Sequence, residues 1–374
     1  MSVKTNFLFL FLFSIAVFSQ EEHTISGTVY DKNNNETLIG VSLYFPELNA
    51  GVTTNEYGFY SVTLPKGTYK VQVNYLGYYS IVETIILNKK ITKNFKLEEE
   101  SESLDEIVIK SNIEKLNVKT PQMSVNRLTS ATIKQIPVVL GEADIIKSLI
   151  LLPGVTSAGE GASGFNVRGG AADQNLILLD EAVVFNSSHL FGFFSVFNPD
   201  VIKDVKLYKG GIPSKYGGRL SSVLDIYQKE GNSNDFKLTG GIGLVSSRLL
   251  AEGPIEKGKS SFLIGGRASY AHLFLPLFNN ENKAYFYDLN SKINYRFNDQ
   301  NNLFLSTYFG KDVFGISDNF VNKYGNSVVN LRWNHLYSDK LFSNLSIIYS
   351  DYFYGLILDF VGFEWDSGIT NFNL

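Results

Sequence analysis

The segment 285-YFYDLNSKINYRF-297 places apolar side chains at alternate positions and polar or charged ones between them. Alternation with a period of two is typical of a β-strand, because successive side chains point to opposite faces of the sheet. A strand with one apolar and one charged face fits between lipid and a wet lumen, although a soluble antiparallel sheet with one wet face shows the same alternation. The two predicted faces carry Tyr285, Tyr287, Leu289, Ile293, Tyr295 and Phe297, and Asp288, Asn290, Lys292, Asn294 and Arg296.

The same pattern recurs before and after this segment. Segments 236–250, 303–309 and 341–349 also favour strands, which gives about six strands near the ~10-residue length that crosses a membrane. Aromatic residues are concentrated here: residues 236–374 hold 27 of them, and the first 235 residues hold 25. Such a concentration fits the aromatic girdles of a membrane barrel. In the other alternating segments, Phe262, Ile264, Gly266, Ala268 and Tyr270 oppose Arg267 and Ser269, and Val329, Leu331, Trp333 and Tyr337 oppose Asn330, Arg332 and Asn334.

The overall composition excludes several classes of protein. Of the 374 residues, 44% are hydrophobic and 19% are charged, which rules out wholesale disorder. The formal charge of −4 supplies no basic surplus for binding nucleic acid. The chain has no cysteine, so it has no disulfide framework, no thiolate metal site and no cysteine that a lipoprotein anchor would acylate.

The N-terminus has the features of a cleavable secretory signal. Lys4 precedes an apolar run from Phe7 to Phe18, and Ser19-Gln20 follows. The run is shorter than the ~20 residues that a spanning helix needs, so we predict a signal peptide over 1–19, with a retained anchor as the alternative. An exported protein with no other apolar helix could enter a membrane only as a closed barrel, because lipid leaves no other way to pair backbone groups.

Residues 20–98 predict a small β-sandwich. Turn segments such as Pro65-Lys66-Gly67 separate runs rich in β-branched and aromatic residues. Within 69–75, Tyr69, Val71 and Val73 alternate with polar residues, which predicts one buried and one solvated face. The predicted strands span 24–30, 41–45, 59–64, 69–75 and 81–87.

A linker over 99–114 follows, beginning with an acidic run. It contains six residues with strand-forming character: Leu104, Asp105, Glu106, Ile107, Val108 and Ile109. A short β-forming segment on a tether can add itself as a strand to the open sheet edge of a partner. An ordinary edge strand of a neighbouring domain is the alternative, and the spacing alone does not separate the two.

The middle of the chain combines one amphipathic helix with glycine-rich turns. Apolar residues at helical spacing predict a helix over 142–152, which Pro153-Gly154 ends. Strands are predicted at 176–179, 182–185, 204–209 and 220–227. The residues at the reversals are Arg168, Gly169, Gly170, Asp180, Gly210, Gly211, Tyr216, Gly217, Gly218 and Arg219.

Two glycine-containing motifs in this region do not indicate a ligand site. Residues 159–164 match GxGxxG, but a dinucleotide site needs this loop after a strand and before a helix. Here the predicted order is reversed, so we reject a cofactor site. Arg168-Gly169-Gly170 occurs once, unlike repeated RNA-binding tracts, and we interpret it as a turn with a structural ion pair.

Two resemblances to known families rest on these segments. The strings 26-SGTVYDKNNNETLIGVSLYF-45 and 53-TTNEYGFYSVTLPKGTYKVQVNYLGY-78 resemble the carboxypeptidase-regulatory-like domain, a transthyretin-like sandwich that usually has Asp at the position of Asn55. Three further strings resemble the plug domain of TonB-dependent outer-membrane receptors of the Bacteroidetes type: 141-GEADIIKSLILLPGV-155, 164-GFNVRGGAADQNLILLDEAVVFN-186 and 189-HLFGFFSVFNPDVIKDVKLYKGGIPSKYGGRLSSVLDI-226. Segment 104-LDEIVI-109 is similar to a TonB box, and Asp180-Glu181 stands where related plugs often have Asp-Gly, which leaves the turn type open.

These resemblances imply a mainly β protein with a sandwich, an α+β plug at 115–230 and the first strands of an antiparallel transmembrane barrel at 231–374. They also imply a periplasmic energy transducer of the TonB type that engages residues 104–109 by strand addition, contact with outer-membrane lipid, and uptake of an unknown large solute. A surface lipoprotein and an anti-sigma factor are further candidate partners, the latter if the protein signals. A secreted or surface β-rich adhesion protein is the alternative from another class.

No arrangement of potential catalytic or metal-binding residues in the sequence points to an enzyme. His23, His189, His272 and His335 are scattered and lack the HxxE or HExxH spacing of zinc hydrolases. We therefore expect no catalytic residue, no cofactor and no metal. A plugged transporter barrel has about 22 strands, so about six strands lead us to expect that the chain is a fragment of a longer gene product.

Overall fold

We describe a computed structural model that covers residues 21–100, 124–129, 132–133, 142–159, 164–273, 282–317 and 319–374. The predicted signal peptide at 1–19 and the box-like segment at 104–109 lie outside the described residues. The chain divides into two compact units, one built mainly from residues up to Glu99 and the other from most of the remainder, and each is described by itself.

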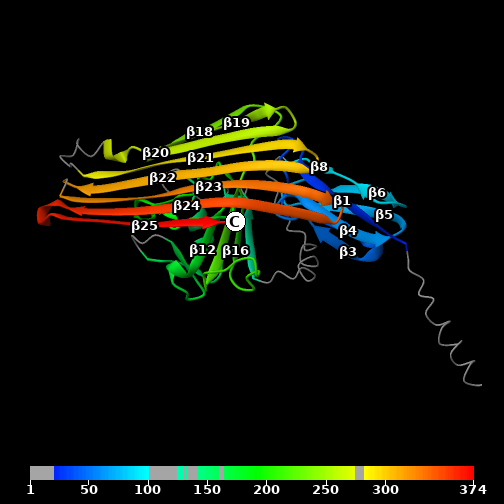
Figure 1. The fold of residues 1–374 in the computed structure, drawn as a ribbon, viewed down its shortest axis with the longest axis horizontal. Helices are drawn as coiled ribbons and strands as arrows, with labels where there is room; N and C mark the ends of the chain where they lie inside the picture. Colours follow the sequence, from blue (N-terminus) through cyan, green and yellow to red (C-terminus); the bar gives the residue numbers. More distant parts are fainter. Residues whose placement is uncertain are drawn as a thin grey trace, which may run out of the picture. The chain divides into compact units, whose positions relative to one another are not determined.

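The first unit is a β-sandwich, as the sequence predicts. One sheet has the order β4-β1-β7, with β8 also paired to β1, and the other has the order β3-β2-β5-β6 (Figure 1). Tyr69, Val71 and Val73 are buried in the core between the sheets, so the predicted facing of this strand is confirmed. The strands are β1 (Glu22–Asp31), β2 (Ser42–Phe45), β3 (Ala50–Thr53), β4 (Phe59–Pro65), β5 (Gly67–Asn74), β6 (Ile81–Leu87), β7 (Ile91–Thr92) and β8 (Phe95–Leu97), with a 3-10 turn η1 (Pro46–Leu48).

The turn before β4 shows why asparagine serves where aspartate is usual. The side-chain oxygen of Asn55 accepts hydrogen bonds from the backbone nitrogens of Tyr57 and Phe59, at 2.9 and 3.0 Å. An amide oxygen supplies this acceptor as well as a carboxylate does. Gly58 is required beside it, because its φ is +75° and a Cβ there would lie 2.7 Å from the side chain of Thr37.

Residues 124–230 of the second unit form a small domain, here called the central domain. Its sheet has five strands in the order β13-β12-β17-β16-β9, in which β12 and β17 run parallel. The predicted helix is shorter than expected: α4 covers Ile145–Ile150, and the Asp144 side chain caps it by accepting from the Lys147 nitrogen at 2.9 Å. Buried apolar residues of α4, β16 and β17 form one core.

The remaining elements of the central domain are short. They are β9 (Val125–Thr129), β10 (Val155–Ser157), β11 (Phe165–Val167), η2 (Ala172–Gln174), β12 (Asn175–Leu179), β13 (Ala182–Val183), β14 (Ser188–His189), η3 (Leu190–Gly192), β15 (Phe194–Ser195), β16 (Ile202–Tyr208) and β17 (Ser222–Gln228).

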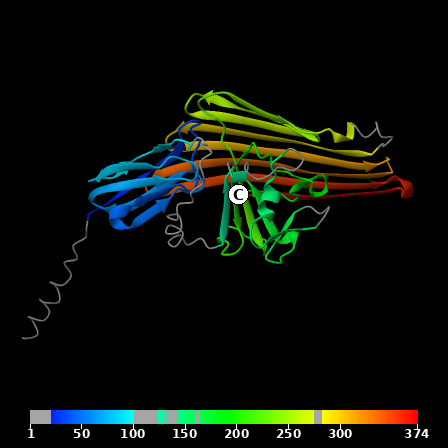
Figure 2. The ribbon, with the colours of Figure 1, turned by 180° about the vertical axis from the view of Figure 1, so that it is seen from behind.

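Eight consecutive antiparallel strands form one long sheet, and Figure 2 shows the central domain against one face of it. The prediction of about six strands was too low. Segment 236–250 forms two strands with a turn at 243–245, and the last strand was missed. The strands are β18 (Lys237–Ile242), β19 (Ser246–Glu256), β20 (Ser260–Ser269), β21 (Lys283–Asn298), β22 (Asn301–Ile316), β23 (Phe320–Ser338), β24 (Leu341–Leu358) and β25 (Phe363–Asn373), with η4 (Ala271–Leu273) and η6 (Asp359–Val361) in connections.

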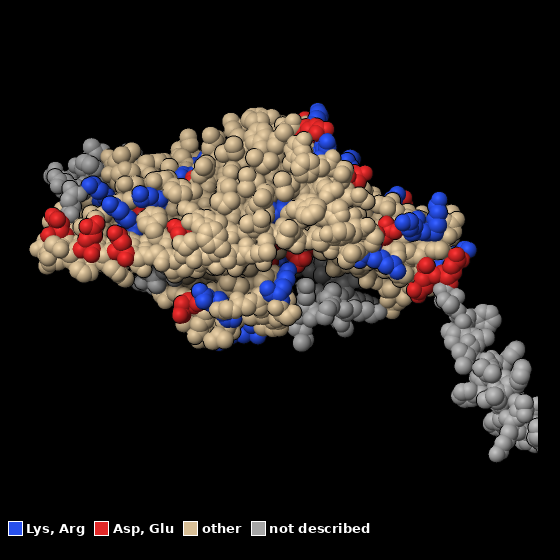
Figure 3. Space-filling view, in the orientation of Figure 1, with Lys and Arg blue, Asp and Glu red and all other residues tan. Residues whose placement is uncertain are grey.

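The two faces of this sheet have the polarity that the sequence predicts. On β21, Leu289 and Ile293 are 49% and 41% exposed, whereas Asp288 and Lys292 are buried against the central domain. Over most of the eight strands the outer face carries few charged side chains (Figure 3). The face that we expected to border a wet lumen is therefore occupied by the central domain. Within the described residues, no helix has both the length and the apolar character needed to cross a membrane.

Candidate functional site

A tight turn of the central domain meets the inner face of the long sheet. Asp180 and Glu181 connect β12 to β13, and their φ angles are +47° and +73°. Positive φ at both central residues defines a type I′ hairpin turn, which settles the turn type that the sequence left open. Glutamate rarely adopts this conformation, and holding it there costs of order 1 kcal/mol or more.

Both turn residues are bound to the sheet through their side chains. The Asp180 carboxylate accepts from the Lys292 Nζ of β21 at 2.9 Å and from the Gln228 backbone nitrogen at 3.0 Å. Glu181 accepts from Asn344 Nδ2 at 3.0 Å and from the Ser346 hydroxyl, both on β24. These contacts hold the turn in a conformation that its own backbone disfavours.

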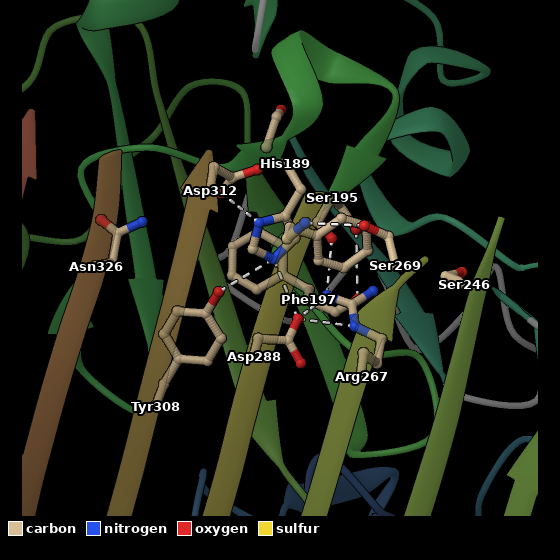
Figure 4. Close-up of polar contacts among 12 residues, drawn as sticks. His189, Ser195, Phe197, Ser246, Arg267, Ser269, Asp288, Tyr308, Asp312 and Asn326 are labelled. Carbon is tan, nitrogen blue, oxygen red and sulfur yellow. Dashed lines mark hydrogen bonds and ion pairs between the residues drawn. The ribbon is translucent and has the colours of Figure 1, made fainter. Parts of the chain in front are cut away.

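His189 is a second anchor, and it is fully buried between two carboxylates. Its Nδ1 lies 2.6 Å from Asp312 Oδ2 on β22, and its Nε2 lies 3.1 Å from Asp288 Oδ2 on β21 (Figure 4). Its ring stacks on Phe286, with centroids 4.2 Å apart. A neutral imidazole has one N–H donor and only the imidazolium has two, so both contacts require protonated His189.

Electrostatics supports this protonation state. Burial alone would lower the pKa of His189, but the nearby carboxylates of Asp312 and Asp288 outweigh burial and raise the pKa above its ordinary value. The protonated form of His189 joins the central domain to β21 and β22 through these two carboxylates.

Arg267 of β20 joins the same network from the sheet side. Its guanidinium donates to the carboxylates of Asp288 and Glu142 and to the backbone oxygen of Ser195 at 3.0 Å. Glu142 and Ser195 belong to the central domain, so one buried arginine bridges the sheet and the domain. We call Glu142, His189, Arg267, Asp288 and Asp312 the buried ionic network.

The predicted turn residues Arg168, Gly169 and Gly170 lie on one loop of the central domain, and Gly210 lies on a second loop beside Arg168. Arg168 and Gly169 form an exposed turn, with φ of +48° and +82°. Arg168 donates to the Ser124 hydroxyl at 3.2 Å, so among the described residues it has a hydroxyl partner in place of the carboxylate that we predicted. A Cβ on Gly210 would lie 2.9 Å from the Arg168 guanidinium, and one on Gly170 would lie 2.3 Å from the Ser221 hydroxyl. Gly211 lies beside Gly210 with a φ of +60°.

The second predicted motif lies on a separate loop. Tyr216 donates to the buried Asp225 carboxylate at 2.6 Å, and burial raises the pKa of Asp225. Gly217 and Gly218 have open space around them, and Arg219 is exposed and donates to the oxygen of Gly218 at 3.2 Å. Among the contacts of the described residues, neither motif touches the buried ionic network.

Sequence reasoning treated His189 as one of four scattered histidines and did not single out Glu142 or Asp312. The sequence pattern indicated only part of this site, because Arg267, Asp288 and Lys292 occupy the polar positions of strands with one apolar face. Within the described part of the chain, no group of three or more His, Cys, Asp and Glu side chains is placed to hold a metal ion. The polar groups of the network contact one another, and the arrangement clamps two parts of the fold together.

Comparison with protein families identifies two domains in the chain. Residues 25–109 match the family described as CarboxypepD_reg-like domain, and residues 117–222 match the TonB-dependent Receptor Plug Domain. The first match includes the box-like segment at 104–109. The second covers most of the central domain.

Individual relatives agree with these matches. TonB-dependent receptor P3 of Formosa agariphila is 28% identical over 138 residues, which cover 36% of this chain and 13% of that protein. The siderophore receptor PirA of Acinetobacter baumannii has a TM-score of 0.52 at 16% identity, over 67% of this chain and 44% of that one. The alcaligin outer-membrane receptor FauA of Bordetella pertussis has a TM-score of 0.51 at 14% identity, over 67% and 42%. The chain thus spans less than half the length of these relatives, and the solved structures establish a shared fold.

Proposed function

Because this chain belongs to the TonB-dependent receptors, a family of outer-membrane receptors and transporters, we propose that the complete protein takes up a scarce, large solute with energy supplied from the periplasm. The observation that carries the proposal is the central domain, which matches the family's plug and is clamped to the inner face of the long sheet by the buried ionic network. A surface adhesin would have no need of a domain fixed in this position.

Closure of the sheet is part of the proposal. Among the described strands, β18 and β25 each have a neighbour on one side only. An unpaired strand edge in lipid costs several kcal/mol for each unsatisfied backbone group. We infer that further strands complete the barrel around the central domain.

The connections between strands support one orientation. At one end of the sheet, β19–β20, β21–β22 and β23–β24 are joined by two or three residues. At the other end the β20–β21 connection has 13 residues, and the remaining three connections have three or four. Membrane barrels have short periplasmic turns and longer extracellular loops. We therefore propose that the ends of β22 and β24, at Ile316 and Leu358, lie on the extracellular side, and the family resemblance favours the periplasm for the N-terminal sandwich.

In the proposed mechanism, a periplasmic transducer pairs with residues 104–109 and pulls. The buried ionic network and the Asp180-Glu181 turn then resist displacement of the plug until force breaks them. No covalent chemistry is required, in agreement with a family of transporters and receptors rather than enzymes.

The first test addresses the box-like segment. We expect Ile107→Pro to abolish solute uptake and capture of the transducer, because proline removes a backbone donor from the added strand. Ile107→Val keeps the donor and serves as the matched control, with near-normal uptake expected. Uptake and co-purification with the transducer are measured in the complete receptor.

The CarboxypepD_reg-like match extends to residue 109, so residues 104–109 are either a box that binds the transducer or an edge strand of the sandwich. A thermal melt of the sandwich in the same variants distinguishes these two roles. Normal uptake by the proline variant would contradict the box assignment. A sandwich that melts early, with partner capture restored at low temperature, would assign the segment to the sandwich as an edge strand.

The second test addresses the membrane-facing surface. Leu289→Arg places a charge on the outer face and should reduce barrel assembly, because a lipid-facing arginine costs up to about 2–4 kcal/mol depending on depth. Arg296→Leu lies on the inner face of the same strand and should be tolerated. The fraction of receptor that is folded and heat-modifiable in outer membranes reports assembly, and equal losses in both variants would refute the facing assignment.

A further inference from the structure

The outer face of the long sheet changes from apolar to charged toward one end. On β22 the outward residue Phe309 is followed by the outward Lys311, and on β23 the outward Val329 gives way to Lys323 at the same end. The inner face shows the opposite order, because Asp312 is the last charged inner residue of β22 before this end. The inner positions beyond it, which are uncharged, are 314 on β22, 320, 322 and 324 on β23, and 352, 354, 356 and 358 on β24. The polarity of the sheet therefore inverts here.

The basic and acidic residues of this outer surface lie on different strands. Figure 3 shows charged side chains of both signs gathered at this end of the sheet. Among the described residues, Lys311 and Lys323 have no carboxylate within ion-pair distance. The basic residues are Lys283, Lys311 and Lys323 on β21–β23, and the acidic ones are Asp351, Glu364 and Asp366 on β24 and β25.

The three lysines border one small area of the outer face, centred on Val313. Val313 occupies an outward position of β22 but is only 5% exposed. Lys323 lies directly opposite it on β23, and Lys311 precedes it by two residues on the same face. Lys283 reaches the same area from β21, because its side chain extends over Gly315, where a Cβ would lie 3.8 Å from the lysine Cδ. Long side chains from three strands thus place their positive charges around one point.

An aromatic ring holds one of these charges in place. The Lys311 Nζ lies 5.8 Å from the centre of the Phe353 ring of β24, a distance at which a cation is attracted to the ring face. Phe353 can lie across β23 only because residue 325 is glycine: a Cβ there would be 2.6 Å from the ring. The ammonium group of Lys311 is therefore kept close to the wall.

Tyrosines mark the level of these lysines along the sheet. Tyr287 lies opposite Lys311 and is 40% exposed on the outer face, and Tyr285 lies opposite Val313. Tyrosine is enriched where a membrane wall passes from the hydrocarbon region into the headgroup region, since its ring is apolar and its hydroxyl is polar. Lysine at this level extends its ammonium toward the headgroups while its aliphatic stem covers apolar surface.

We propose that Lys283, Lys311 and Lys323 together bind the headgroup phosphate of an anionic lipid. The inference rests on the proposed function, because it takes the outer face of the long sheet as the wall that contacts lipid. Two observations select this occupant: the lysines continue the apolar outer face without a break, and their charge is complementary to phosphate, which lysine binds as a point charge. In the proposed orientation the lipid belongs to the outer leaflet.

A local reporter of lipid occupancy tests this proposal. Ser327 is outward on β23, opposite Phe309 and four residues from Lys323. In the complete receptor, freed of any cysteine in its remaining strands, Ser327→Cys is labelled with bimane and reconstituted in phosphatidylcholine bilayers. A small fraction of the lipid carries a nitroxide quencher near the headgroup, either as phosphatidylglycerol or as phosphatidylcholine. We expect phosphatidylglycerol to occupy this position more often, by about fivefold for each lysine that reaches the phosphate.

Variants in the same reporter background identify the residues responsible. Lys311→Gln with Lys323→Gln should bring the ratio of the two lipids close to one, and the corresponding double arginine variant should retain the preference. The matched control is Lys257→Gln with Lys340→Gln, which removes the same charge from exposed turns at the other end of the sheet and should leave the ratio unchanged. Heat-modifiable gel mobility confirms that each receptor is folded.

Equal quenching by both lipids in the native receptor would overturn the phosphate site and leave the membrane-facing surface intact. A preference that survives the double glutamine variant, or that the control variant also removes, would overturn it as well. Absence of quenching by either lipid would instead contradict the lipid-facing wall itself, and with it the proposed function. The measurement needs neither solute nor transducer, so its outcome is independent of the Ile107 test of energised uptake.

Discussion

Replacing Arg267 with leucine is expected to loosen the plug from the sheet by about 3–5 kcal/mol. The variant leaves the buried carboxylates of Asp288 and Glu142 without the guanidinium that joins them. Removing one partner of a buried ion pair is costly, because the remaining charge stays desolvated. The expected effect therefore exceeds that of losing a surface pair, which is worth about 1 kcal/mol or less.

The measurement uses the absence of cysteine in the chain. Ser148→Cys places one thiol in the buried face of α4, and its labelling rate in urea reports opening of the central domain. We expect labelling to be roughly 10²-fold to several 10³-fold faster in Arg267→Leu, because each 1.4 kcal/mol corresponds to about tenfold. Arg296→Leu, on the same face but outside the network, is the control. Equal protection in both variants would show that the network does not hold the plug.

The second large effect is a pH dependence that originates at His189. Its pKa is raised in the folded protein, so the stabilisation is fully present below the ordinary histidine value of about 6.5 and is lost as pH rises through the folded pKa. The native receptor should therefore expose its plug more readily in alkaline solution. His189→Gln should open at least tenfold faster at neutral pH, since a charge-assisted hydrogen bond contributes about 1.5–3 kcal/mol, and its opening should vary less with pH.

The same thiol label, normalised to an exposed cysteine at each pH, measures this effect. His335→Gln is the matched control, because His335 contacts Asn301 at 2.7 Å and takes no part in the network. A native profile that stays flat from pH 6 to 9, or that is shared by His189→Gln, would rule out His189 as the proton-dependent contact.

Local patterns in the sequence predicted much of the fold. Alternation along 285–297 predicted β21 and its facing, because side-chain direction in a strand follows directly from residue number. The same pattern failed at 236–250, where Gly243 and its neighbours form a turn between two strands. The strand β25 was also missed, although Phe363, Trp365 and Ile369 alternate there with Glu364, Asp366 and Thr370.

The candidate site was far less accessible to sequence reasoning. His189 and Asp312 are 123 positions apart, and Glu142 and Arg267 are 125 apart. Each is an ordinary polar residue among its own neighbours, so no local spacing marks it. Even Arg168, predicted to form an ion pair, has a serine hydroxyl as its partner in the described structure.

The sequence by itself determined the strand periodicity, the glycine-dependent turns and the order of domains, because these depend on contacts and backbone angles within a few residues. Only the tertiary structure decided which charges meet and where the polarity of the sheet inverts. The physical reason is that a charge can be buried only where a partner arrives from elsewhere in the chain. Pairing of Arg267 with Glu142, and of His189 with Asp288 and Asp312, exists only once the central domain is seated against the strands.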